Sequence, residues 1–309
     1  MQVVVLAGGV GASRFLAGLV SLIRPEQITA VVNVGDDFEQ LGLQISPDLD
    51  TVLYTLGGLV HPDQGWGRAD ESSNALSAAA ALGGPDWFFL GDKDIGLHLV
   101  RTNRLGAGER LSSITADFAR RLGIGIRLLP STDDPVTTML ETLGGTFDFQ
   151  TYFVRRRHTD EVDAVRYEGA AEALPAEGVL DALATADLAI IAPSNPFLSI
   201  GPILAVPGIA DALAERRGPT AAVTPIIGGR AVKGPADRLL RRFYGEASPV
   251  TVAEHYRDLI THMLIDSADQ DELARLKAHG IRAQAVDTLM SDSAARARVA
   301  RAVLELAER

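Results

Sequence analysis

Short hydrophobic runs alternate with segments of helical spacing through the first third of the chain. Val3–Leu6 is a continuous apolar run, as expected of a strand buried on both faces, and Thr29–Val34 is interpreted as a second such strand. Between them, Ala12–Ile23 carries apolar residues at helical spacing. This alternation predicts βαβ units and a parallel sheet. In the same part we expect helices Thr51–Leu59, Ser72–Leu82 and Ser112–Leu122 and strands Trp87–Leu90 and Arg127–Leu129.

The pattern changes between Thr137 and Glu168. Thr146–Val154 alternates polar and apolar residues with a period of two, which favours a strand, and Val162–Tyr167 is its candidate partner. We therefore expect residues 135–176 to form a small β-rich insertion subdomain.

The α/β pattern returns after the insertion. We expect helices Gly178–Thr185, Ile209–Arg216, Ala236–Tyr244, Val252–Leu259, Gln270–His279 and Ser293–Ala307 and strands Asp187–Ile191 and Thr220–Thr224. The predicted fold class is a doubly wound, mostly parallel, Rossmann-like α/β sheet. Residues 1–134 and 177–309 would form this nucleotide-binding core.

Composition narrows the class of partner. Lys and Arg total 29 against 40 for Asp and Glu, which gives a net charge of −11. Such a surface repels nucleic acid and anionic lipid, so we expect neither as a partner. A glycine loop or a metal ion can still hold a small phosphorylated ligand. The chain has 0 Cys, which excludes disulfides, thiolate catalysis and iron–sulfur clusters.

The start of the chain, MQVVVLAGG, lacks a basic segment, and glycines soon break its apolar run, so we expect no signal peptide. Nothing approaches the roughly 18 unbroken apolar residues of a membrane helix. We expect a cytoplasmic protein that acts on small molecules, and we expect it to be a homodimer.

A glycine loop joins the first predicted strand to the first predicted helix. Gly8, Gly9 and Gly11 lie where free N–H groups and the positive end of the helix dipole favour phosphate. The loop is a poor dinucleotide motif, because Arg14 replaces the third glycine and Asn33 stands where a ribose-binding acid is expected. The alternative interpretation is a tight turn without a ligand.

Four acids follow the second predicted strand: Asp36, Asp37, Asp48 and Asp50. Ligands of an open α/β sheet bind beyond the carboxyl ends of its strands. Four carboxylates there repel one another unless a cation or proton compensates, and Mg²⁺ suits carboxylates together with phosphate oxygens. The alternative is that Asp50 caps the helix that follows.

Three further segments are candidate ligand contacts. Lys93, between two acids after the predicted strand Trp87–Leu90, is either a ligand anchor or part of a surface ion pair. Ser194 and Asn195 are suited to a ribose or nucleobase, with a plain turn as the alternative. Gly229 and Lys233 belong to a possible second anion-binding loop. The scattered His residues and the arginines of the last helix are interpreted as core or surface residues.

Taken together, these segments resemble the 2-phospholactate/phosphoenolpyruvate transferases of coenzyme F-420 biosynthesis. The matching stretches, in chain order, are LAGGVGASRFLAGL, VVNVGDD, SPDLDTVLYTLGGL, GWGRADES, FLGDKDIGLHLVRTNRL, PSNPFLSIGPIL and TPIIGGRAVKGPAD. They span most of the chain, and their combination is specific although each alone is not.

The resemblance implies that the terminal ribityl hydroxyl of the deazaflavin precursor Fo attacks a guanosine diphosphate ester. A phosphorylated three-carbon acid is transferred, GMP leaves and Mg²⁺ is required. The resemblance places Fo near Asp50 and Lys93, and the metal-site acids among the four Asp. Asp50 could orient or deprotonate the hydroxyl while Mg²⁺ neutralises phosphate charge.

Other activities share parts of this pattern. LAGGVGASR also resembles the start of sugar-phosphate nucleotidylyltransferases, which release pyrophosphate. A non-catalytic nucleotide-sugar-binding regulator and a nicotinamide dehydrogenase are further alternatives. No side chain identifies the three-carbon acid of the donor unambiguously. The Ala- and Arg-rich composition is typical of bacterial chains, and the resemblance implies that the bacterial branch of the family mostly uses phosphoenolpyruvate. We therefore favour that donor.

Overall fold

A computed structural model describes residues 1–308, and within them seven strands form a parallel central sheet. Their order is β14-β13-β10-β9-β1-β2-β5. In chain order these strands are β1 (Val3–Ala7), β2 (Ile28–Val32), β5 (Arg127–Pro130), β9 (Leu188–Ile191), β10 (Thr220–Val223), β13 (His262–Asp266) and β14 (Arg282–Val286). The predicted doubly wound α/β class is confirmed. The chain builds outward in both directions from β1, so the topological switch point lies between β1 and β9.

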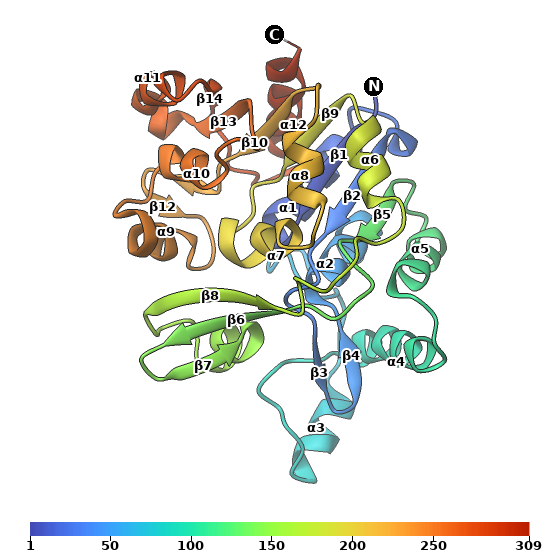
Figure 1. Cartoon of the computed structure of the whole chain (residues 1–309). Helices are drawn as coiled ribbons and strands as arrows, with labels where there is room; N and C mark the ends of the chain where they lie inside the picture. The colour runs from blue at the N-terminus through green and yellow to red at the C-terminus, as the bar shows by residue number, and fades with distance from the viewer. Residues whose placement is uncertain (309) are drawn as a thin grey trace.

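Helices cover both faces of this sheet (Figure 1). On one face, α1 (Gly9–Leu19) packs against α2 (Pro47–Leu56) and α12 (Ser293–Ala307), while α6 (Val179–Thr185) and α8 (Ile209–Ala214) pack together on the other. The remaining helices are α3 (Asn74–Ala81), α4 (Asp92–Gly106), α5 (Leu111–Arg121), α7 (Gly201–Leu204), α9 (Ala236–Tyr244), α10 (Pro249–His255) and α11 (Leu273–Ala278). No helix in this described part is long and apolar enough to span a membrane.

The first and last helices approach unusually closely. A side chain at Gly18 of α1 would collide with the backbone carbonyl of Arg296 in α12. Glycine therefore lets the two helix backbones approach, while Phe15 and Leu16 of α1 are fully buried in the core. The helix that begins at the glycine loop is held from behind by the end of the chain.

The predicted strand Trp87–Leu90 is wrong. Residues 87–90 are irregular, and Leu90 packs with Leu43 and Ile45 of a hairpin formed by β3 (Phe38–Gln40) and β4 (Leu43–Ile45). This apolar run therefore reflects packing onto a neighbouring hairpin rather than membership of the central sheet.

The chain also contains a separate antiparallel sheet in the order β7-β6-β8, which lies below the central sheet in Figure 1. Its strands are β6 (Thr137–Thr142), β7 (Gly145–Asp148) and β8 (Val162–Glu168). The predicted pairing of Thr146–Val154 with Val162–Tyr167 is wrong, because β8 pairs with β6 and Thr151–Arg155 forms a π-helical turn, η2. The insertion boundaries at residues 135 and 176 stay a prediction.

Candidate functional site

The candidate site lies along the edge where the central strands end. The glycine loop is the junction between β1 and the first turn of α1, the loop after β2 carries Asp36 and Asp37, and the loop after β9 carries Ser194 and Asn195. Because β1 lies between β2 and β9, these loops are neighbours at the switch point. The fold thus brings most of the predicted site residues to one edge, where open α/β sheets bind ligands.

Two glycines at the junction of β1 and α1, the N-cap Gly8 and Gly11 of the first turn, are required by packing. A Cβ at Gly8 would lie 2.6 Å from the Cβ of Ser199, and one at Gly11 would collide with the carbonyl oxygen of Pro193. The Ser194 hydroxyl donates a hydrogen bond to the carbonyl oxygen of Gly8 at 2.8 Å. The turn interpretation therefore accounts for Gly8 and Gly11, and their contact with a nucleotide stays a prediction.

Gly9 lies beside the acids, whereas the side-chain oxygen of Asn195 is already used in hydrogen bonds. Gly9 has a φ of +70°, which favours glycine, and a Cβ there would lie 3.4 Å from a carboxylate oxygen of Asp48. Asn195 uses its side-chain oxygen to cap η3 (Pro196–Ile200), accepting hydrogen bonds from the N–H groups of Phe197 and Leu198. Gly9 thus faces the acids, whereas the side-chain oxygen of Asn195 already has a structural role.

Asp36 and Asp48 form a buried pair of carboxylates. The side-chain amide of Asn33 donates to both, at 3.2 Å to Asp36 and 2.9 Å to Asp48. Burial and the nearby carboxylate of Asp48 raise the pKa of Asp36 well above its usual range. Burial also raises the pKa of Asp48 to about 6, although hydrogen bonds from Asn33 and the Gly9 backbone oppose the shift. Within the described residues, the only side chain that donates a hydrogen bond to this pair is the neutral amide of Asn33, so no positive charge of the chain compensates the two carboxylates directly.

Asp37 lies beside this pair with one oxygen bound. Its Oδ2 accepts a hydrogen bond from Ser46 at 2.7 Å, while Oδ1 is buried with no partner in the described structure. Burial raises the pKa of Asp37 well above its usual range. A buried carboxylate oxygen without a partner is costly, and a cation would offset that cost.

These acids fit Mg²⁺ in number and kind. Mg²⁺ commonly takes one or two carboxylates and completes its shell with water and phosphate oxygens. Asp36 and Asp48 both touch one amide nitrogen, so their carboxylates are close enough for such an ion. Within residues 1–308, no group of three or more acidic or histidine side chains is arranged to hold a metal ion by itself. Water and the phosphate oxygens of a ligand would therefore supply the remaining positions of the coordination shell.

Asp50 lies near these acids and takes part in a second buried network. It lies inside α2, whose N-cap is Ser46, so the capping alternative for Asp50 is wrong. Both of its carboxylate oxygens accept hydrogen bonds from the guanidinium of Arg101, one of them at 3.0 Å. Although burial opposes the shift, the carboxylate of Asp50 raises the pKa of Arg101. Asp50 is thus neutralised by a partner within the chain.

The network continues from Arg101 to Asp94. His98 Nδ1 lies 3.3 Å from Arg101 Nη1, and His98 Nε2 lies 3.4 Å from Asp94 Oδ1. Tyr54 donates its hydroxyl hydrogen to the same carboxylate. Although burial opposes the shift, the nearby His98 ring and the hydrogen bond from Tyr54 lower the pKa of Asp94. Tyr54, His98 and Arg101 are members of this network that were not predicted from the sequence.

Lys93 lies in the first turn of α4 and does not follow a strand. Its ammonium donates to the backbone carbonyl of Asp70 at 2.7 Å, and its backbone N–H donates to Glu71. The neighbouring Asp92 accepts hydrogen bonds from Asn74 and from the backbone N–H of Ala75, which lower its pKa to about 2. The Lys93 side chain is exposed. Its neighbour Asp94 belongs to the buried network described above, which connects α4 to Asp50.

Gly229 and Lys233 lie on a second loop at the same edge, after β10. Gly229 has a φ of +75° in the turn between β11 (Ile226–Ile227) and β12 (Arg230–Ala231). Lys233 donates to the backbone carbonyl of Gln64 at 2.8 Å. The N–H of Gly228 is already bound to Asp269, whereas the ammonium of Lys233 has three donors and uses one of them on Gln64.

Comparison with known proteins gives a consistent result. Residues 3–304 match the family model described as 2-phospho-L-lactate transferase CofD. A phosphoenolpyruvate transferase of Streptomyces griseus is 46% identical over 314 residues, covering 100% of this chain and 99% of the relative. One of Thermobifida fusca is 44% identical over 321 residues, covering 99% and 98%. A crystal structure of a Bacillus halodurans protein shares the fold, with a TM-score of 0.67 at 18% identity over 98% of this chain and 99% of that one.

Proposed function

The chain belongs to the 2-phospho-L-lactate transferase CofD family, enzymes of coenzyme F-420 biosynthesis, and we propose that its acceptor is the deazaflavin Fo. In this proposal the ribityl hydroxyl of Fo attacks the phosphate of a guanosine diphosphate ester. A phosphoenolpyruvyl group is transferred and GMP leaves. Curated relatives at 40–46% identity are named phosphoenolpyruvate transferases, which supports phosphoenolpyruvate over 2-phospholactate.

The observation that carries the proposal is the buried acid cluster beside the glycine loop. Asp36 and Asp48 would hold Mg²⁺, with Asp37 Oδ1 as a further oxygen nearby. A bound Mg²⁺ would neutralise charge on the bridging and leaving phosphate oxygens. Asn33 orients both carboxylates through its amide. Gly9 leaves open the space between the acids and the start of α1.

Asp50 would accept a hydrogen bond from the attacking hydroxyl of Fo. The two-pronged contact with Arg101 holds the carboxylate in one orientation, so Asp50 is suited to positioning the acceptor. Lys93, whose helix is tied to Asp50 through Asp94, His98 and Arg101, would donate to a ring carbonyl of Fo.

The proposal is tested by incubating the purified protein with Mg²⁺, Fo and each guanylated donor, followed by mass spectrometry of the deazaflavin. A mass gain corresponding to phosphoenolpyruvate, with GMP in equal amount, is the expected result. No mass gain with either the phosphoenolpyruvyl or the 2-phospholactyl donor would overturn it. Pyrophosphate release from a nucleoside triphosphate and a sugar phosphate would indicate the nucleotidylyltransferase alternative instead.

A further inference from the structure

The acid Asp36 lies in a tight turn of the loop after β2. The N–H of Asp37 donates to the carbonyl oxygen of Val34 at 3.1 Å and closes this turn. That hydrogen bond uses neither carbonyl of the two central residues, Gly35 and Asp36. Both residues are buried, so their carbonyls need partners elsewhere in the chain.

Those partners come from the region of the antiparallel sheet β7-β6-β8, far along the chain. The N–H of Thr138 in β6 donates to the carbonyl oxygen of Gly35 at 2.8 Å. The side-chain amide of Gln150 donates to the carbonyl oxygen of Asp36 at 3.1 Å. A Cβ at Gly35 would lie 2.7 Å from the hydroxyl oxygen of Thr138, so the turn packs closely against β6. This sheet and its π-helical turn therefore hold both central carbonyls of the turn that carries Asp36.

Gln150 is itself firmly held. It is 3% exposed and directly precedes η2. The carboxylate of Asp148 accepts hydrogen bonds from the N–H and the hydroxyl of Thr151, at 2.9 Å and 2.6 Å, which fixes the start of η2. Tyr152 of the same turn is buried in the core. The amide of Gln150 therefore reaches Asp36 from a well-packed support.

Two neutral amides thus hold two parts of Asp36. Asn33 donates to its carboxylate at 3.2 Å, and Gln150 donates to its main-chain carbonyl. Neither amide carries a charge, so together they fix the carboxylate while its negative charge stays available to a cation. Outer partners that orient a ligand in this way are a main control on metal affinity.

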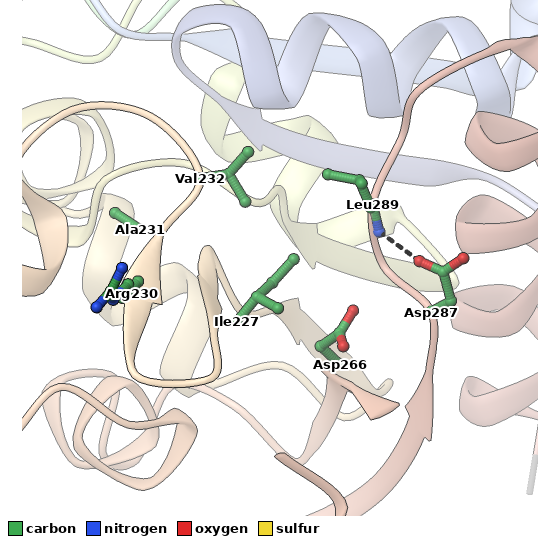
Figure 2. A pocket seen from close by; sticks show the side chains of 7 residues that line it. All are labelled: Ile227, Arg230, Ala231, Val232, Asp266, Asp287 and Leu289. Atoms are coloured by element: carbon green, nitrogen blue, oxygen red, sulfur yellow. Dashed lines mark hydrogen bonds between the residues drawn. The ribbon is translucent and has the colours of Figure 1, made fainter. Parts of the chain in front are cut away.

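Two acids at the other end of the same sheet edge show the contrast. Figure 2 shows Asp266 and Asp287 beside a pocket of about 350 Å³. Asp266 accepts hydrogen bonds from Ala268 and Thr288, and Asp287 is paired with the guanidinium of Arg298 at 2.7 Å. Hydrogen-bond donors and a cation of the chain already act on these carboxylates directly, unlike the Asp36–Asp48 pair.

We propose that Gln150 is a positioning residue of the metal site, because its amide holds the main chain of Asp36 and so keeps the Asp36 carboxylate beside that of Asp48. The inference rests on the proposed function, since that reaction uses the metal, and it gives the antiparallel sheet a part in the site. Gln150 touches no substrate in this role and acts only through Asp36. Loss of its amide should therefore weaken metal binding and leave the affinity for Fo unchanged.

The test measures Mn²⁺ binding to the full chain by electron paramagnetic resonance, in which the signal of free Mn²⁺ falls as the ion binds. Mn²⁺ prefers the same oxygen ligands as Mg²⁺. Gln150→Met keeps the length of the side chain but cannot donate a hydrogen bond. It should raise the Mn²⁺ dissociation constant roughly tenfold, as is common for lost outer partners of metal ligands. If this variant does not fold, Gln150→Asn, which stays polar but is too short to reach Asp36, should show the same loss.

Gln40→Met is the matched control. Gln40 is as buried as Gln150, at 4% exposed, and its amide likewise donates to a backbone carbonyl, that of Phe88, at 3.0 Å. It lies at the turn of the β3–β4 hairpin, where it pairs with Leu43. Each variant loses one buried hydrogen bond of the same kind, so the two should show similar falls in melting temperature. Only Gln150→Met should bind Mn²⁺ more weakly.

A further variant separates Gln150 from the sheet as a whole. Tyr167 in β8 donates its hydroxyl hydrogen to the carbonyl oxygen of Phe197 in η3 at 2.7 Å. Tyr167→Phe therefore removes a hydrogen bond between the same sheet and a different loop, and its Mn²⁺ affinity should stay like that of wild type. In turnover assays, saturating Mg²⁺ should bring Gln150→Met back towards the wild-type rate, because mass action then refills the weakened site.

Three results would overturn the inference. One is a wild-type chain that binds no Mn²⁺. Another is a Gln150→Met variant with the Mn²⁺ affinity of wild type or of Gln40→Met. The third is an equal loss of Mn²⁺ affinity in Gln150→Met and Tyr167→Phe, which would assign the effect to the sheet as a whole. Failure of the proposed function is a different observation, namely Mn²⁺ binding that depends on Gln150 without product from Fo and either guanylated donor.

Discussion

The two ends of the sheet edge that carries the candidate site have opposite charges, and the chain provides different partners for these charges. At the end beyond β2, each acid has a hydrogen-bond donor from the chain, such as Asn33 for Asp36 and Asp48. At the end beyond β10, Arg14 and Lys233 reach only backbone carbonyls. Both ends hold like charges together, so both favour a ligand of the opposite sign. A magnesium-bound phosphate ester carries both signs and could bridge them, which neither end alone would suggest.

The largest expected effect is at the acidic end. Asp48→Asn keeps the size of the side chain but removes one charge of the Asp36–Asp48 pair, so turnover should fall by roughly 10²–10⁴-fold. Steady-state rates at several Mg²⁺ concentrations measure this. Asp181→Asn, an exposed acid of α6, is the control. Near-normal turnover of Asp48→Asn in low Mg²⁺ would remove the acidic end from the reaction.

Arg101→Met should be the most destabilising of these changes. It leaves Asp50 buried without its cation, which typically costs about 3–5 kcal/mol of unfolding free energy. Urea denaturation measures the loss. The double variant Asp50→Asn/Arg101→Met should recover part of it, because no charge is then left unpaired. Additive losses in the double variant would show that the two side chains do not act as a pair.

The stability of the metal-free protein should fall as the pH rises. The pKa of Asp48 is raised from 3.8 to about 6 in the fold, so the folded state binds a proton more tightly than the unfolded state. Its contribution is present below about pH 4 and is lost as the pH rises through about 6, on the order of 1–3 kcal/mol. Thermal melts between pH 4 and 7 with and without Mg²⁺ check this. Mg²⁺ should stabilise the protein more at pH 7 than at pH 5, and Asp48→Asn should flatten the curve.

Lys93 should show the smallest effect. Its one side-chain contact within the described residues is a carbonyl at the surface, so Lys93→Ala should leave stability within about 1 kcal/mol. If it contacts Fo, the KM for Fo should rise about three- to tenfold while that for the donor stays constant. Lys93→Arg should behave like wild type. Fluorescence titration of Fo measures this directly, and an unchanged dissociation constant in Lys93→Ala would contradict the assignment.

The central strands were predictable because burial on both faces leaves a clear pattern. Val3–Leu6 reads as a continuous apolar run, and β1 is buried throughout. β13 and β14 were missed because their runs, HMLID and RAQAV, mix polar residues into short segments toward the edge of the sheet. Trp87–Leu90 was wrongly predicted as a strand because its residues are apolar, but they pack against the β3–β4 hairpin and not within the central sheet.

For the candidate site, the sequence predicted which edge of the sheet carries the site residues but not which side chains pair with one another there. Strand ends identify where Asp36 and Asp37 lie, because parallel strands end at a common edge. That Asp50 pairs with Arg101 depends on how α4 lies against α2, which no local spacing records. One signal was available: Asp94, His98 and Arg101 follow one another at spacings of four and three, which puts them on one face of a helix.

The close contact between Gly18 of α1 and Arg296 of α12 has a consequence for folding during translation. Ribosomes produce roughly 5–20 residues per second, so α1 waits many seconds for the helix that covers it. β1 likewise waits for β9, its partner on one side. A nascent chain therefore lacks both the β9 neighbour of β1 and the Met290 carbonyl beside Arg14 until these residues have been translated. Chaperones that shield apolar surface would find the side of α1 that faces α12 exposed throughout that interval, and substrates would find no finished binding edge.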